Sequence, residues 1–180
     1  MATETEIKLR ARDGILARVE GLGFHVQTPR QLEADQLYDR GSELRESGQV
    51  LRLRTRGSRS TLTYKGPAQR VPHKSREEIE LDVTDGAAFV LVLARLGYQP
   101  GFRYEKYRTT FSAEGAPGII TYDETPAGTF LEIEGPGAWI DEIALKLGYD
   151  PAEYISESYA SLWRAYCTSH PAAVPSAMVF

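Results

Sequence analysis

Near the N-terminus, the sequence TETEIKLR places three charged side chains, Glu4, Glu6 and Lys8, at every second position. Successive side chains of a β-strand point to opposite faces, so these three share one face of the strand that the alternation predicts. Like charges crowded along one strand face repel each other, so the face needs a counter-charge. A solvent-exposed strand face is the simpler interpretation of this strand alone, and a site for a charged ligand is the alternative.

The same spacing recurs in later segments, and there the charges are sorted by sign. The residues concerned are Arg52, Arg54, Lys65, Lys106 and Arg108 among the basic ones, and Glu78, Glu80, Asp123, Glu132 and Glu134 among the acidic ones. An ordinary solvated strand face mixes polar residue types, so sorting across many strands favours a ligand site. If the sheet closes with these faces inside, bound counter-charges become necessary.

The two sets of charges suit two halves of one ligand. The acidic set offers oxygen ligands without a convergent histidine, which favours Mg²⁺ or Mn²⁺ over zinc. The basic set suits several phosphates in a row, because arginine can bind phosphate oxygens in a bidentate manner. A metal-bound polyphosphate would satisfy both sets.

The first half of the chain must position these residues mainly on strands. Alternation predicts a strand over 3–10, and a helix is expected from Asp13 to Leu22. Residues 24–38 are expected to be extended, and residues 40–48 to form a polar connection. Two alternating runs, 50–56 and 59–65, are separated by Gly57-Ser58, which predicts a tight hairpin.

The second half adds four strands and three helices. Residues 66–75 are expected to form a loop, followed by a strand in REEIELDV and a helix from Thr84 to Leu96. The remaining strands are expected around 102–112, 118–123 and 129–134, before helices in AWIDEIALKLG and ISESYASLWRAY. Hairpins dominate this order, which favours an antiparallel sheet in an α+β domain.

Composition sets the class of protein. The chain has 180 residues, 42% hydrophobic and 26% charged, with a net charge of −4, which indicates one ordinary globular domain. No basic patch with interleaved aromatics is present, so duplex nucleic acid is not an expected partner. Cys167 is the only cysteine, which excludes an internal disulfide and fits a reducing cytoplasm. No apolar run suggests a membrane span or a signal peptide.

The order of the charged motifs resembles that of the CYTH family, the triphosphate tunnel metalloenzymes. That family includes class IV adenylate cyclases, thiamine triphosphatases and inorganic triphosphatases. The motifs that carry the resemblance are ExExK at 4–8, VLRLRTR, LTYKGP, SREEIELDV, YEKYRTTF and YDETPAGTFLEIEG. The resemblance spans about residues 4–166, so we expect a single domain over 1–167 and a C-terminal tail or docked extension over 168–180.

The resemblance implies a fold and a set of roles. The fold would be an eight-stranded antiparallel closed β-barrel, a triphosphate tunnel with a charged interior and amphipathic helices packed outside. The implied metal ligands for Mg²⁺ or Mn²⁺ are Glu4, Glu6, Glu132 and Glu134. The implied triphosphate ligands are Lys8, Arg52, Arg54, Lys65, Lys106 and Arg108. The implied catalytic residues are Lys8, Glu78, Glu80 and Asp123, with Asp123 and one of the two glutamates orienting ligands or water.

Two reactions and one non-catalytic role remain open. Attack by water on the terminal phosphorus gives a triphosphatase, which we favour because water is always available. Attack by a ribose 3′-hydroxyl on the α-phosphorus gives a class IV adenylate cyclase, which releases cyclic AMP and pyrophosphate. A polyphosphate- or nucleotide-binding module is disfavoured because the whole carboxylate series is present. The expected partner is a small triphosphate, namely ATP, thiamine triphosphate or inorganic triphosphate, and a homodimer is a further expectation.

Overall fold

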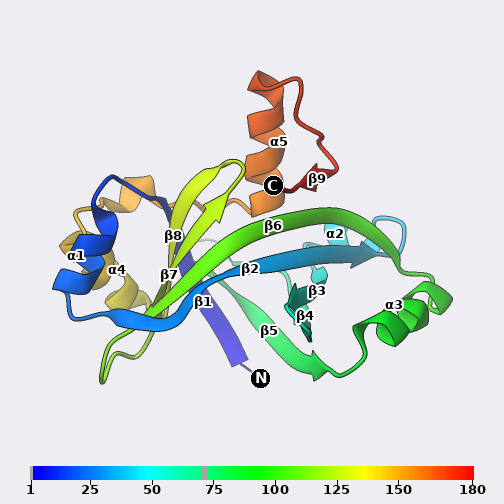
Figure 1. Cartoon of the computed structure of the whole chain (residues 1–180), viewed down its shortest axis with the longest axis horizontal. Helices are drawn as coiled ribbons and strands as arrows, with labels where there is room; N and C mark the ends of the chain where they lie inside the picture. The colour runs from blue at the N-terminus through cyan, green and yellow to red at the C-terminus, as the bar shows by residue number, and fades with distance from the viewer. Residues whose placement is uncertain (1, 70–72) are drawn as a thin grey trace.

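A computed structural model of the chain describes residues 2–69 and 73–180. Eight antiparallel strands form its main sheet, and they are β1 (Ala2–Arg10), β2 (His25–Asp39), β3 (Val50–Arg56), β4 (Arg59–Lys65), β5 (Lys74–Val83), β6 (Gln99–Ser112), β7 (Ile119–Thr125) and β8 (Gly128–Glu134). They follow the order β2-β3-β4-β5-β1-β8-β7-β6, and β2 also pairs with β6. This pairing closes the sheet into the predicted barrel, and β2 and β6 lie side by side across the front of Figure 1.

The hairpin predicted from residue 50 to residue 65 is confirmed. Strands β3 and β4 pair from Val50 with Lys65 to Arg56 with Arg59. Gly57 begins the turn with a φ of 57°, in the left-handed region that glycine adopts without steric cost. Because the register is unbroken, Arg52 and Arg54 point to the same side of the sheet.

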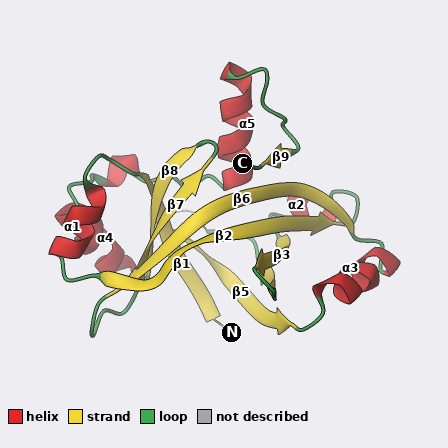
Figure 2. Cartoon of the chain, viewed as in Figure 1, coloured by secondary structure: helices red, strands yellow, loops and turns green. Residues whose placement is uncertain are grey.

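Helices pack outside the barrel, as predicted. Two of them, α1 (Ile15–Gly21) and α4 (Gly137–Lys146), lie together at one end, and α3 (Gly86–Arg95) lies at the other (Figure 1; helices are red in Figure 2). Ile140 and Leu147 are fully buried in one core cluster with outward-facing strand residues such as Leu9. No helix in the described part of the chain is long and apolar enough to cross a membrane.

Two local expectations are wrong. The first helix begins at Ile15 after Gly14, with no side-chain cap, so Asp13 does not cap it. The polar connection at 40–48 contains a short helix, α2 (Glu43–Glu46), whose start is held by backbone N–H groups donating to the Asp39 carboxylate. One outer part of the sheet has no helix over it, since Ile79 and Leu81 on the outer face of β5 are 44% and 48% exposed.

The C-terminal residues dock against the barrel. Helix α5 (Tyr159–Ser169) is followed by a short strand, β9 (Ala177–Met178), which runs parallel to β6. The indole N–H of Trp163 donates to the carbonyl oxygen of Val174 at 2.9 Å. Met178 is fully buried and belongs to a core cluster with Trp163. Residues 168–180 are thus a packed extension of the fold.

We expect Met178→Ala to lower the free energy of unfolding by about 2–3 kcal/mol, because it leaves a cavity in this cluster. Val179→Ala is the matched control, since Val179 is 41% exposed and its truncation should change the free energy by less than about 0.5 kcal/mol. Urea unfolding followed by circular dichroism measures both variants. Equal stability of Met178→Ala and the wild type would show that the extension does not stabilise the barrel.

Candidate active site

The barrel encloses a cavity of about 570 Å³ whose wall is built from charged side chains. All eight strands and the start of α5 contribute to the wall. Among the predicted site residues, the ones that line it are Glu4, Glu6, Lys8, Arg52, Arg54, Lys65, Glu78, Glu80, Lys106, Arg108, Glu132 and Glu134. The structure therefore brings these residues together around one space, and Asp123 is the member of the predicted set that lies elsewhere.

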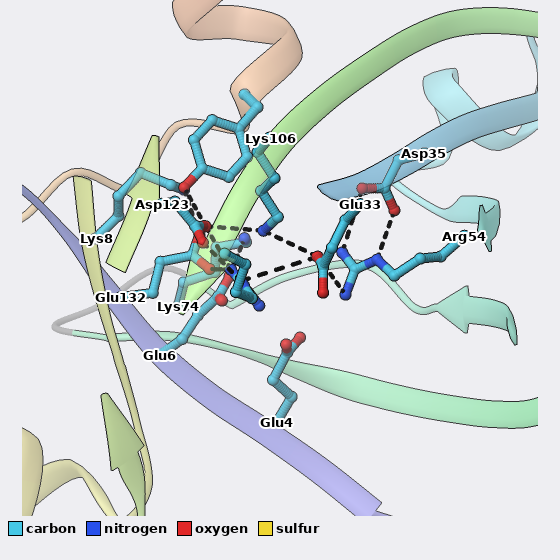
Figure 3. Close-up of polar contacts among 12 residues, drawn as sticks. Glu4, Glu6, Lys8, Glu33, Asp35, Arg54, Lys74, Lys106, Asp123 and Glu132 are labelled. Atoms are coloured by element: carbon cyan, nitrogen blue, oxygen red, sulfur yellow. Dashed lines mark hydrogen bonds and ion pairs between the residues drawn. The ribbon is translucent and has the colours of Figure 1, made fainter. Parts of the chain in front are cut away.

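One group of charges surrounds Glu4, whose side chain is labelled in the lower part of Figure 3 without these partners. The ammonium group of Lys65 donates to the two carboxylate oxygens of Glu4 at 2.7 and 2.6 Å and lies 3.0 Å from Glu78. Arg76 Nε donates to Glu4 at 3.3 Å. Burial disfavours the charged form of Glu4, but Lys65, Glu78 and Arg76 together outweigh burial and lower the pKa of Glu4 to about 2. Burial, together with the neighbouring Glu4, raises the pKa of Glu78 to about 7.

A second group joins β1 to β8. Lys74 donates to Glu6, and Arg108 donates to Glu132. Lys8 Nζ lies 3.2 Å from the Glu132 carboxylate and donates to a backbone oxygen of residue 157. Burial opposes ionisation of Glu132, yet Lys8 and Arg108 hold its pKa well below the usual range. These carboxylates are therefore already neutralised by cations of the protein.

Glu134 differs from the other predicted metal ligands. Among the described residues no ion pair involves it, and its side chain keeps contact with solvent in the cavity. Partial burial, followed by the neighbouring carboxylates of Glu4 and Glu6, raises the pKa of Glu134 to about 7. The described part of the chain holds no ready-made cluster of three metal-ligating side chains. The assignment of Glu4, Glu6, Glu132 and Glu134 as metal ligands thus stays a prediction.

Asp123 lies behind the cavity wall and is completely buried. Its carboxylate accepts hydrogen bonds from Lys106 Nζ at 2.8 Å and from Arg108 Nε at 2.6 Å. The hydroxyl of Tyr159 donates to it at 2.7 Å. Asp123 therefore fixes two of the predicted phosphate ligands, instead of facing a ligand itself.

Several residues of the site are not among those predicted from the sequence. Tyr159 lines the cavity from the start of α5, and Lys8 Nζ lies 4.5 Å from the centre of its ring. Lys74 belongs to a segment that was expected to be a loop but begins β5. Glu33 and Asp35 on β2 contact the arginines of β3 (Figure 3). The alternation of Glu33 and Asp35 was visible in the sequence LEAD, but two acidic residues alone gave no reason to choose them.

The arrangement can bind an extended anion. Arg52, Arg54, Lys106 and Arg108 are nearly buried, yet each borders the cavity, so their N–H groups meet a ligand in a partly desolvated space. Charge-assisted hydrogen bonds are strong in such surroundings. Burial and the adjacent Arg108 lower the pKa of Lys106, and an anion beside it would favour its charged form.

Comparison with known proteins identifies relatives of this fold. MJ0240 of Methanocaldococcus jannaschii, named provisionally as an adenylate cyclase, is 28% identical over 133 residues, which cover 73% of this chain and 74% of that protein. The structure of PH1819 from Pyrococcus horikoshii is similar with a TM-score of 0.77 and 27% identity, covering 91% of this chain and 99% of that chain. The structure of HpAC1 from Hippeastrum gives a TM-score of 0.63 at 17% identity, covering 92% and 96%.

The family assignment comes from the sequence match. The CYTH domain matches residues 2–159, which is most of the chain. This range contains all eight barrel strands and every predicted site residue. The chain therefore belongs to the CYTH domain family.

Proposed function

We propose that this protein is a divalent-metal-dependent enzyme that binds a small molecule carrying a triphosphate inside the barrel and hydrolyses it. The observation that carries the proposal is the enclosed cavity, where basic side chains of β3, β4 and β6 and carboxylates of β1, β5 and β8 line one space. Phosphoryl transfer depends mainly on positioning and on charge neutralisation. Both are supplied by a wall of this kind.

The basic side chains bind and orient the phosphates. Arg52 and Arg54 extend from β3, and Lys106 and Arg108 extend from β6, so cations reach the ligand from two strands. They also stabilise the charge that develops on phosphate oxygens in the transition state. Lys8, held by Glu132 and by Tyr159, adds a cation from β1.

The carboxylates fit a hard divalent cation. Their donor atoms are all oxygens, and Glu134 has a carboxylate without an ion-pair partner in the described part of the chain. Glu4, Glu6 and Glu132 would complete the set after exchanging the lysine and arginine partners that they have here. A bound Mg²⁺ or Mn²⁺ supplies neutralisation of phosphate charge and acidification of water.

Hydrolysis breaks the terminal phosphoanhydride bond, consumes one water and releases orthophosphate and a proton. Outside the predicted metal ligands, Glu78 is the lining carboxylate best suited to accept this proton, because its pKa is raised to about 7 and so lies near neutral pH. Glu80, which accepts a hydrogen bond from Thr63 at 2.8 Å, would help to orient the water. Asp123 contributes through Lys106 and Arg108.

Adenylate cyclisation is the second candidate. The name of MJ0240 favours it, whereas the description of HpAC1 attributes to that protein a dominant triphosphatase activity. The same cavity wall could hold ATP for either reaction, and the choice depends on whether water or a ribose hydroxyl attacks.

The products distinguish these functions. Purified protein is incubated with ATP, thiamine triphosphate or inorganic triphosphate, each with Mg²⁺ or Mn²⁺. We expect orthophosphate without cyclic AMP. Cyclic AMP together with pyrophosphate would establish the cyclase instead, and tight metal-dependent binding without turnover would indicate a binding module.

We expect Glu6→Gln to lower kcat at least about 100-fold, because it removes a predicted metal ligand and releases Lys74. The fold should persist, since one of several crowded carboxylates is lost. Product assays and thermal unfolding test the two parts. Glu20→Gln on the exposed face of α1 is the control and should keep full activity. Loss of folding in Glu6→Gln would indicate a structural role.

The raised pKa of Glu134 predicts a pH dependence of stability. In the unfolded chain this group releases its proton near pH 4.5, and in the folded chain near pH 7. Between these two pH values the folded chain therefore binds more protons than the unfolded chain. The contribution of Glu134 to the free energy of unfolding is complete below pH 4.5 and is lost as pH rises through about 7. Metal-free wild type should lose more stability than Glu134→Gln over this interval.

Urea unfolding between about pH 5 and pH 8 measures this difference. Added Mg²⁺ should restore stability to the wild type more than to Glu134→Gln, because the cation would replace the proton. Glu20→Gln should follow the wild-type pH dependence. Parallel curves for the wild type and Glu134→Gln would contradict the predicted titration.

A further inference from the structure

Two carboxylates on β2 lie beneath the basic side chains of the cavity. Glu33 and Asp35 are both 0% exposed, and neither borders the cavity. Arg54, which does border it, contacts both of them (Figure 3). They belong to none of the motifs from which the site was predicted.

Asp35 fixes the orientation of Arg54. The two residues are direct cross-strand neighbours in the β2–β3 pairing. Arg54 Nε donates to Asp35 Oδ1 at 2.8 Å and Arg54 Nη2 to Oδ2 at 3.5 Å, while Arg52 Nε lies 3.3 Å from Oδ1. A guanidinium group is planar, so holding one edge fixes its plane and leaves other N–H groups for a ligand.

Glu33 joins the cations of β3 to those of β6. Its Oε1 accepts a hydrogen bond from Arg56 Nε at 2.6 Å. Its Oε2 lies 3.2 Å from Arg54 Nη1, 3.8 Å from Lys106 Nζ and 3.9 Å from Arg108 Nε. This oxygen has no hydrogen bond among the described residues although it is buried. Glu33 thus acts as a shared counter-charge for four basic side chains.

These contacts have two opposite effects on anion binding. A buried negative charge beside the phosphate ligands repels an incoming phosphate, so removing the charge should strengthen binding on Coulombic grounds. The same carboxylates hold mutually repelling cations in one arrangement, so removing them should weaken binding by loss of preorganisation. The sign of the change reveals which effect dominates.

We propose that Glu33 and Asp35 are positioning residues for triphosphate binding, and that the orientation they impose on Arg52, Arg54 and Lys106 outweighs the repulsion they exert on the ligand. This inference rests on the proposed function, because it takes a triphosphate as the ligand. In metal sites, carboxylates placed behind a ligating side chain orient it and raise its effectiveness, and we apply the same reasoning to cations that bind phosphate.

The test compares Asp35→Asn and Glu33→Gln, which keep the side-chain shape and remove the charge. Isothermal titration calorimetry with inorganic triphosphate measures binding, once with EDTA and once with Mg²⁺. We expect about 10-fold weaker binding in each variant, as is typical for loss of such a supporting contact. The matched control is Glu153→Gln, which breaks the exposed ion pair with Arg12 outside the barrel and should bind as the wild type does.

A double-mutant cycle checks that Asp35 acts through Arg54. If it does, Asp35→Asn should weaken binding far less in an Arg54→Gln background than in the wild type. Full additivity would overturn this part of the inference. Unchanged or tighter binding in both single variants would overturn the whole of it, because repulsion would then dominate.

The remaining outcomes are also decisive. Circular dichroism reports whether each variant folds, and loss of folding in both would overturn the inference by making the pair a folding element. If the wild type binds triphosphate under neither condition, the proposed function itself fails. If the wild type binds triphosphate and both variants bind it equally well, the positioning role fails while the proposed function stands.

Discussion

Charge compensation inside the barrel is the constraint on which the rest of the structure depends. An unpaired charge in a partly desolvated space is costly, so each buried cation needs an anion within reach. Lys65 meets Glu4, Lys8 meets Glu132, and Arg54 meets Asp35. In the free protein, carboxylates and cations thus neutralise each other. A metal-bound anion would neutralise the same two sets of charges. When such a ligand binds, its metal ion and its phosphates would replace the internal ion pairs, so neither the carboxylates nor the cations would be left unpaired.

The barrel makes this arrangement compatible with folding. Closure through β2 and β6 removes the sheet edges and turns one face of every strand inward. The outward face then supplies the apolar surface on which α1, α3 and α4 pack. Helix α5 instead packs against Tyr104 and Phe130, beside the cavity that its residue Tyr159 lines. Much of the hydrophobic core therefore lies outside the barrel wall, and its stabilising free energy can offset the cost of assembling charges within.

The charged interior has two layers with different tasks. Side chains that border the cavity, such as Arg54 and Lys106, keep donor groups available to a ligand. The carboxylates of Glu33, Asp35 and Asp123 lie behind them and never meet solvent. A basic cluster without such a layer would spread apart by mutual repulsion. Preorganisation of this kind lowers the cost of binding and of charge stabilisation, which suits the proposed triphosphate ligand.

The sequence by itself determined the hairpin, most of each strand and the inward face of every strand except β2, because a period of two with sorted charges on one side shows which face carries the charges. It also determined many of the charged side chains that share the cavity, although it did not indicate Tyr159 or Lys74. Only the tertiary structure decided that Asp123 lies behind the wall, that Asp35 holds Arg54, and that residues 168–180 dock on β6. Those contacts depend on the register and shear between strands far apart in the chain and on packing in three dimensions. Periodicity along one strand contains no information about either.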